Sequence, residues 1–304
     1  MKRKIKEIIK ARFIGGMYFQ DLIVVCKNIL FENEKCFSLK NRYILETYFL
    51  GNKFAINRFY NYLRKNYGEK SYFNFGGILF PEAKSFQVKG DLILTWLDFI
   101  YPYLSNDYND FLDEGPYLYK NTQITKGDVV IDAGANLGLF SALASFLGGL
   151  VYAFEPVKEI REEYLKKTAE LNKNIFSVPY GLSNKKEIIN IQGNNMGSAT
   201  IIAERKKNIK NNIINEYIEV ISLDQWVKEN NIPRVDFIKA DIEGAERLML
   251  EGAQWVLKTF SPKLSICTYH LPDDKEVLQK LILQANSNYK IIHDWKKLYA
   301  WVEK

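Results

Sequence analysis

The chain has 304 residues, of which 47% are hydrophobic, and its formal net charge is +6. A chain of this length buries a sizeable core without disulfide bonds. Its three cysteines, Cys26, Cys36 and Cys267, show neither CxxC spacing nor a pairing pattern, which is typical of reduced thiols in a cytoplasmic protein. The composition argues against a secreted disulfide-rich protein and against a zinc ribbon.

The positive charge is concentrated at the N-terminus, where residues 1–12 hold six basic side chains and one acidic side chain. The rest of the chain is nearly neutral, whereas nucleic-acid binding needs a spread cationic surface, so no nucleic-acid partner is expected. Residues 1–13 predict a helix with apolar residues along one side. It is either an ordinary helix, which we prefer, or a weak membrane-surface contact. It lacks the features of a signal peptide.

The first 110 residues are crowded with Tyr, Phe, Asn and Lys and show no regular alternation of strands and helices. We predict helices to about Tyr67 and mixed structure afterwards. Residues 1–110 would then form a mainly helical accessory subdomain, and residues 111–304 the second domain. Clustered aromatic residues usually pack in a core, which we prefer to a platform that stacks against sugars.

From about residue 124 short β-branched runs alternate with helical stretches, which is typical of a parallel sheet with crossover helices. The uncharged run Ala133–Phe154 has the length of a membrane span, but Gly148-Gly149 divides it into a helix and a strand, so no transmembrane segment is expected. The predicted strands of this half are 129–131, 150–154 and 175–178, and the predicted helices are 138–146 and 158–171.

The second half of the domain begins with an irregular segment. Residues 187–191 and 199–202 read as the two arms of an inserted β-hairpin around a turn-rich centre at 193–198. Its tip, 194–198, either covers the ligand crevice or is a solvent turn. Further on we predict strands at 217–221, 235–240 and 264–268 and a helix at 223–230. The last two strands lead to Asp241 and His270. The fold class is therefore α/β, with a mostly parallel Rossmann-like sheet.

A glycine-containing turn follows the first strand of this sheet, at Asp132–Gly138. A dinucleotide fingerprint would need glycines at 134, 136 and 139, but the chain has Gly134, Asn136 and Leu139. S-adenosylmethionine has no phosphate, and its amino-acid part needs only a close approach to backbone, which Gly134 and Gly138 permit. The turn therefore favours S-adenosylmethionine over a dinucleotide.

Two carboxylates flank this turn. Asp132 leads into it and is expected to accept hydrogen bonds near the ammonium group of the cofactor. Glu155 ends the second strand 23 residues later, where a carboxylate reaches both ribose hydroxyls in this architecture and disfavours a 2′-phosphate. Either residue alone would also fit a helix cap or a solvated turn. Together they predict a cofactor site.

Four motifs resemble those of the FkbM-type methyltransferases, in the order of that family. They are Asp132-Ala-Gly-Ala-Asn-Leu-Gly138, Phe154-Glu-Pro156, Ser222-Leu-Asp224 and Lys239-Ala-Asp-Ile-Glu-Gly-Ala-Glu246. The resemblance covers roughly residues 110–270. It implies a class I methyltransferase sheet and an S-adenosylmethionine-dependent O-methyltransferase that acts on hydroxyls of sugars, glycans or secondary metabolites. Glu114-Gly-Pro-Tyr117 is similar to the turn that faces the cofactor in this family, so Tyr117 is a candidate cofactor contact.

The candidate catalytic residues lie at the carboxyl ends of two predicted strands. Asp241 and His270 are both candidates for the general base and stay unranked, and Glu243 is expected to orient substrate or cofactor. Lys239 is expected on the opposite face of the sheet, in a structural ion pair. A divalent metal bound by Asp241, Glu243 and His270 is an alternative, but no spacing is diagnostic of one, and no metal is predicted.

Gly181 and Leu182, after the third strand, are expected to contact the adenine through backbone and apolar atoms. One alternative to a methyltransferase is an NAD-dependent oxidoreductase, against which the broken glycine fingerprint speaks. Another is a non-catalytic cofactor-binding protein whose aromatic N-terminal region mediates interactions. The sequence determines neither the acceptor nor the oligomeric state.

Overall fold

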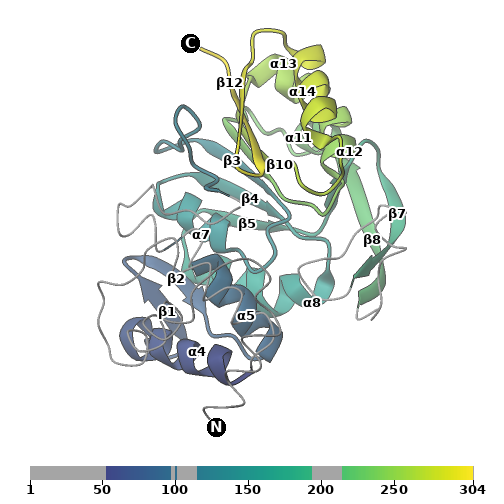
Figure 1. Ribbon diagram of the computed structural model, residues 1–304. Coiled ribbons are helices and arrows are strands. Elements are labelled where there is room, and N and C mark those ends of the chain that lie inside the picture. Colours follow the sequence, from purple (N-terminus) through teal and green to yellow (C-terminus); the bar gives the residue numbers. More distant parts are fainter. Residues whose placement is uncertain (1–52, 97–99, 101–114, 194–213, 304) are drawn as a thin grey trace, which may run out of the picture.

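The computed structural model describes residues 53–96, 100, 115–193 and 214–303 (Figure 1). Residues 1–13, 194–198 and 199–202, for which we predicted a helix, the hairpin tip and a hairpin arm, lie outside this part of the chain. Among the described residues, no helix combines the length and the apolar character needed to cross a membrane.

A seven-stranded sheet forms the centre of the described structure, with the strand order β11-β12-β10-β9-β3-β4-β5. The strands from β10 to β5 in this order pair in parallel, and β12 is antiparallel to both of its neighbours. This confirms the predicted α/β class and the class I methyltransferase sheet. The bounds are β3 Val129–Ala133, β4 Leu150–Phe154, β5 Ile175–Val178, β9 Phe237–Ala240, β10 Lys263–Cys267, β11 Lys290–Asp294 and β12 Lys297–Trp301.

Helices cover both faces of this sheet, and alternate residues of each strand enter two separate hydrophobic cores. On β3, for example, Val130 packs on the side of α7 and Ile131 on the side of α13. Burial on both faces explains why these strands are almost continuously apolar. The bounds are α7 Leu139–Phe146, α8 Lys158–Ile160, η3 Arg161–Leu165, α9 Lys166–Leu171, α11 Leu223–Glu229, α12 Glu246–Glu251, α13 Gln254–Phe260 and α14 Asp274–Ala285.

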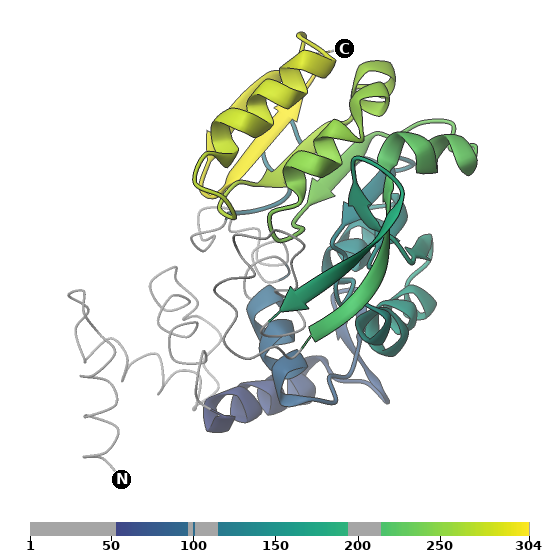
Figure 2. The same cartoon turned by 90° about the vertical axis from the view of Figure 1, so that its right-hand side faces the viewer.

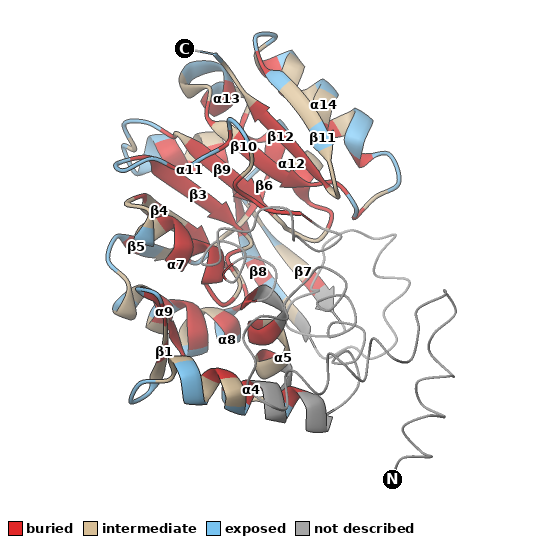
Figure 3. Cartoon of the chain, turned by 60° about the vertical axis from the view of Figure 1, so that its left-hand side comes forward, coloured by how far each residue is buried: buried red, intermediate tan, exposed pale blue. Residues whose placement is uncertain are grey.

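The described part of the N-terminal region packs beneath α7 and α9 (Figure 1). It consists of α4 Lys53–Tyr67, β1 Tyr72–Phe75, β2 Ile78–Pro81 and α5 Phe86–Thr95. Phe73, Phe75 and Trp96 are fully buried, which confirms that these aromatic side chains form a core. Figure 3 shows the buried residues running from this layer up to the central sheet.

The inserted hairpin exists, but its second arm differs from the prediction. β7 Glu187–Gly193 pairs antiparallel with β8 Ile214–Ser222 over its whole length, and β6 Gly181–Ser183 lies parallel on the other side of β8. The arm predicted at 199–202 is therefore not the partner of β7. The β-branched run at 217–221, which we read as an independent strand, fills that place. Figure 2 shows β7 and β8 extending beside the central sheet.

Candidate active site

A cavity opens at the carboxyl ends of β3, β4 and β9, at the edge of the sheet where open α/β folds bind ligands. Eight of the predicted site residues line it: Tyr117, Gly134, Asn136, Glu155, Gly181, Leu182, Asp241 and Glu243. Asp132, Gly138 and His270 are not among its lining residues. Three of the four motifs identified in the sequence, Asp132–Gly138, Phe154–Pro156 and Lys239–Glu246, therefore meet at this cavity.

Gly134 is the point at which the Asp132–Gly138 motif contacts the Lys239–Glu246 motif. Its φ is +73°, and a Cβ built on it would lie 2.0 Å from the backbone oxygen of Asp241. The backbone N–H groups of Gly134 and Ala135 both donate to the Phe154 carbonyl, at 3.1 and 2.9 Å. We expected Gly134 to admit the cofactor. The structure shows in addition that the β9 end packs directly against it.

Gly138 plays a structural part behind the cavity. It is the N-cap residue of α7 and has a φ of +85°. A Cβ there would lie 2.8 Å from Leu165 and 3.0 Å from Thr168. The missing side chain therefore lets α7 approach the helix that follows β4, and Gly138 itself does not line the cavity.

Asp132 is fully buried one layer behind the cavity. Its Oδ2 accepts a hydrogen bond from Ser141 at 2.6 Å, and its Oδ1 forms an ion pair with Lys239 at 3.0 Å. Lys239 lines the cavity and donates to the Gly134 carbonyl at 2.8 Å. Our expectation that Lys239 points to the opposite face was wrong, since residues two apart on a strand share a face, and Asp241 is two residues on. The expected ion pair is present.

Glu155 lies at the end of β4 and lines the cavity, with 5% of the residue exposed. Its Oε2 accepts from the Asn136 N–H at 3.0 Å and its Oε1 from the Val157 N–H at 2.8 Å. Burial raises the pKa of this carboxyl to about 7, although both backbone N–H groups lower it. Each carboxylate oxygen keeps a further lone pair to accept a hydroxyl of a ligand.

Asp241 also lines the cavity and lies just beyond β9. Its Oδ2 accepts from the Tyr117 hydroxyl at 2.7 Å, and its Oδ1 accepts from the Tyr269 hydroxyl at 3.4 Å. Burial acts to raise the pKa of Asp241, but the charges of Lys239 and His270 and the Tyr117 hydrogen bond outweigh it and lower the pKa below its ordinary value. Asp241 is therefore a carboxylate at neutral pH.

Tyr117 owes its position to a buried lysine on the last strand. Lys297 is fully buried, donates to the Gly115 carbonyl at 2.8 Å and lies 4.4 Å from the centroid of the Tyr117 ring. The Tyr299 hydroxyl donates to the neighbouring Pro116 carbonyl at 2.5 Å. The turn before Tyr117 is thus fixed from β12, which sequence analysis did not anticipate.

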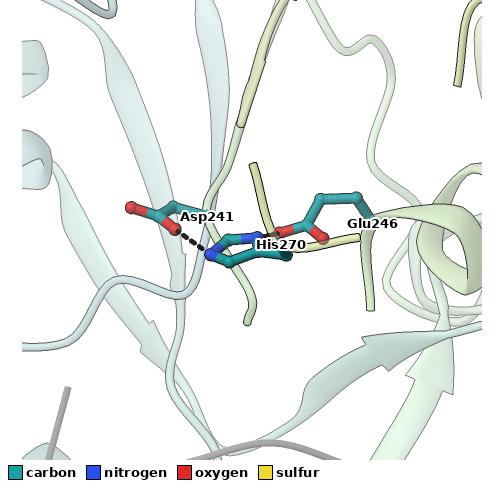
Figure 4. A group of neighbouring side chains, drawn as sticks. All are labelled: Asp241, Glu246 and His270. Carbon is teal, nitrogen blue, oxygen red and sulfur yellow. Dashed lines mark ion pairs between the residues drawn. The ribbon is translucent and has the colours of Figure 1, made fainter. Parts of the chain in front are cut away.

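His270 lies between two carboxylates, as Figure 4 shows. Its Nε2 is 3.5 Å from Asp241 Oδ1, and its Nδ1 is 2.9 Å from Glu246 Oε1. Burial acts to lower the pKa of His270, but Glu246, Asp241 and Glu243 outweigh it and raise the pKa to about 9. The imidazole is therefore protonated at neutral pH, and a protonated ring cannot accept a proton.

Asp241, Glu246 and His270 also lie close enough together to suggest a metal site, with ligand atoms within 4.8 Å of one another. However, Asp241 approaches Nε2 and Glu246 approaches Nδ1 (Figure 4). One ion binds only one ring nitrogen, so the two carboxylates do not complete a single coordination shell around this histidine. The contacts in place are those of a chain of ion pairs.

Sequence analysis missed two parts of the site. The hairpin contributes Ile191, Ile218 and Val220 to the cavity wall, and the alternation of buried and exposed residues along β8 is the signal that indicates it. Glu246, the last residue of the Lys239–Glu246 motif, was read only as part of the motif. The helix dipole alone favours an acidic residue in the first turn of a helix. The position of Glu246 in the sequence therefore did not indicate a contact with His270.

The sheet order and a ligand cavity at the carboxyl ends of its strands are those of a class I methyltransferase. Residues 132–291, more than half of the chain, match the family described as Methyltransferase FkbM domain. The chain belongs to this family of methyltransferases. The predicted resemblance is thereby confirmed, and the oxidoreductase alternative loses its support.

Among characterised relatives, the chain is 25% identical over 167 residues to the hexuronic acid methyltransferase AglP of Haloferax volcanii. The match covers 54% of this chain and 65% of that protein. Similar solved structures include an FkbM methyltransferase from Methylobacillus flagellatus (20% identity, TM-score 0.45, 72% of this chain and 55% of that one). Another is Aeropyrum pernix fibrillarin with natively bound S-adenosyl-L-methionine (12% identity, TM-score 0.36, 59% and 67%).

Proposed function

We propose that this methyltransferase uses S-adenosylmethionine to methylate a hydroxyl of a sugar, a glycan or a secondary metabolite. The observation that carries the proposal is the placement of Glu155, a nearly buried carboxylate that ends β4 and faces the cavity beside the Gly134 turn. The family membership supports the reaction class, and the hexuronic acid methyltransferase among its relatives favours a sugar acceptor.

The residues of the cavity fit the cofactor. Glu155 would accept hydrogen bonds from both ribose hydroxyls, because each of its oxygens has one backbone donor and spare acceptor capacity. Gly181 and Leu182, with Ile218 from the hairpin, would bound the adenine, and Asn136 and Gly134 supply backbone near the ribose and amino-acid parts. Asp132 would act through Lys239 rather than by direct contact. When bound, S-adenosylmethionine supplies a sulfonium methyl that an oxygen nucleophile attacks as the carbon–sulfur bond breaks.

Asp241 is the group in this cavity that would take the proton of the acceptor hydroxyl. It lines the cavity as a carboxylate, whereas His270 lies behind it and is already protonated. A positioned base contributes about 10²–10⁴-fold, and alignment of the reacting atoms up to about 7–11 kcal/mol of the barrier. Tyr117 holds Asp241 Oδ2, and Glu243 would orient the acceptor.

The division of the chain into an accessory subdomain, 1–110, and a cofactor-binding domain, 111–304, is part of the same proposal. The described part of the first segment contacts α7 and α9 and does not contribute to the cavity lining. Binding of the cofactor would therefore depend on residues after 110.

The experiment is calorimetry of the purified chain with S-adenosylmethionine, S-adenosylhomocysteine and NAD, followed by transfer assays with ¹³C-methyl-labelled cofactor. Neutral sugars and hexuronic acids serve as acceptors, and the chemical shift of the new methyl carbon distinguishes an ether from an ester or an amine. We expect binding of both sulfur compounds and an O-methyl product. Binding of NAD alone would refute the proposal, and cofactor binding without transfer to any hydroxyl would favour a non-catalytic role.

A further inference from the structure

We propose that Glu246 is a positioning residue, which holds His270 as a cation behind Asp241 and thereby keeps the Asp241 carboxylate turned toward the acceptor. The inference deepens the proposed function and rests on it, since it assigns His270 and Glu246 to the support of the base rather than to proton transfer itself.

The first support is geometry. Glu246 and His270 side chains are 0% and 1% exposed, and they lie 2.9 Å apart. Glu246 begins α12, and its Oε1 also accepts the Ile242 N–H at 2.8 Å, so the loop that carries Asp241 and the helix that carries Glu246 are joined. The far side of the imidazole faces Asp241 Oδ1 at 3.5 Å (Figure 4). The order from the cavity inward is Asp241, His270, Glu246.

The second support is charge. Among the described residues, the charged groups within ion-pair distance of His270 are Asp241 and Glu243 after β9 and Glu246 on α12. The Tyr269 ring packs 4.2 Å from the imidazole, centroid to centroid. Three carboxylates around one neutral ring would repel one another in a site with little water, whereas an imidazolium attracts all three. The raised pKa of His270 agrees with this charge state.

The third support is the anchoring of the loop that follows β10. Arg247, next to Glu246, pairs with Asp274 at 2.8 Å and with Asp273 at 2.6 Å. Asp274 in turn accepts the Leu271 N–H at 2.7 Å. Two adjacent residues at the start of α12, Glu246 and Arg247, therefore hold the His270 loop in place. This leaves the imidazole little freedom to turn away from Asp241.

Nuclear magnetic resonance of the ¹³C-histidine-labelled full chain tests the inference, because the chain has only two histidines. The signal that is missing from the spectrum of His270→Gln belongs to His270, and the other belongs to His293. We expect His270 to titrate near pH 9 in the wild type, and in Glu246→Gln to shift by at least about one pH unit toward its ordinary 6.5. Glu246→Gln keeps an oxygen for the Ile242 N–H. Glu251→Gln, at the exposed end of the same helix, should leave the His270 titration unchanged, and His293 is an internal reference.

Kinetics supply the functional measurement. The alkaline limb of the kcat profile should move down by at least about one pH unit in Glu246→Gln, with the KM for S-adenosylmethionine unchanged, because Glu246 does not line the cavity. A purely structural role would lower kcat equally at every pH. An unshifted His270 titration in the folded variant, or activity that is lost with EDTA and restored by Mg²⁺ or Zn²⁺, would overturn the inference. If the wild type neither binds S-adenosylmethionine nor transfers a methyl group, the proposed function is refuted. The His270 titration still tests the interaction between Glu246 and His270 in that case.

Discussion

Glu155 illustrates how a single side chain can make ligand binding depend on pH. Its carboxyl is nearly buried, and burial raises its pKa to about 7, so the free protein holds a proton there below that pH. A protonated carboxyl accepts fewer hydrogen bonds than a carboxylate. Under the proposed function, ribose hydroxyls would donate to Glu155 and would need its ionised form.

We expect the affinity for S-adenosylmethionine to rise with pH up to about 7 and then to level off. One unit below the pKa only about a tenth of the carboxyls are ionised, so at pH 6 the affinity should be about tenfold weaker than the plateau. Glu155→Gln should bind less tightly by about 1.5–3 kcal/mol at pH 8 and lose most of this dependence. Calorimetry at pH 6, 7 and 8 measures both, and an affinity of the variant equal to the wild type would mean that the ribose lies elsewhere.

Asp241 should affect turnover far more than cofactor binding. Asp241→Asn keeps the shape of the side chain and an acceptor for the Tyr117 hydroxyl but removes the proton acceptor. We expect kcat to fall by about 10²–10⁴-fold, with a cofactor affinity close to that of the wild type. Single-turnover kinetics with saturating cofactor provides the measurement. A fully active Asp241→Asn enzyme would exclude Asp241 as the base.

For single residues, the sequence predicts which residues line the cavity better than it predicts where each side chain points. Motif positions correctly brought Glu155, Asp241 and Glu243 to one cavity. Lys239 was placed on the wrong face, although its spacing from Asp241 contained the answer. The protonation of His270 could not be predicted, because it depends on Glu246, which reaches the ring only through the packing of α12 against the following loop.

Among the elements, the turn after β3 has the tightest steric requirement. Gly134 and Gly127 both have positive φ, +73° and +91°, but a Cβ on Gly127 would meet nothing within 4 Å, whereas one on Gly134 would meet Asp241 backbone. The two glycines therefore separate the cost of backbone conformation from the cost of close packing.

We expect Gly127→Ala to lower the free energy of unfolding by about 1–2 kcal/mol, the cost of a left-handed alanine. Gly134→Ala should lower the free energy of unfolding by about 1–3 kcal/mol more than Gly127→Ala does, because the backbone that carries Asp241 must move away. Urea denaturation gives both values. Turnover should fall only in Gly134→Ala, and equal effects of the two substitutions would show that the contact is not tight.

The parallel strands β4 and β5 match the predicted bounds, although β5 lies at the edge of the sheet. Each is a short run of mainly apolar residues between clear breaks. β11 and β12 were missed. β11 is mostly half-exposed and contains Lys290 and His293, and β12 begins with a buried lysine, so neither follows a simple pattern. The partner of β7 was misassigned because register across a long loop is not encoded locally.

On the scale of the whole molecule, the N-terminal layer and the sheet share one hydrophobic core. Residues from α4 and β1 belong to the same buried cluster as residues of β3 and α7. The Asn172 side chain completes the connection, because it donates to the Leu79 carbonyl at 2.7 Å and accepts the Leu79 N–H at 3.1 Å. An amide side chain thus pairs with β2 as a strand would.

We expect Asn172→Ala to lower the free energy of unfolding by about 1–3 kcal/mol, since it leaves both polar groups of Leu79 without these bonds. Asn66→Ala, which removes one exposed bond to Tyr62 within α4, is the matched control and should have little effect. A single denaturation transition for the wild type, followed by fluorescence and by circular dichroism, would agree with a shared core. Two separate transitions would instead support an independent accessory subdomain.

The buried Lys297 connects β12 to the cavity through Tyr117. β12 inserts between β10 and β11, and its lysine fixes the turn that carries Tyr117, the partner of Asp241. Removal of β12 would leave Glu155 and Asp241 in the chain but would remove the Lys297 contacts with the Gly115 carbonyl and the Tyr117 ring. The hydrogen bond from the Tyr117 hydroxyl to Asp241 is therefore expected to depend on a strand that itself contributes no residue to the cavity lining.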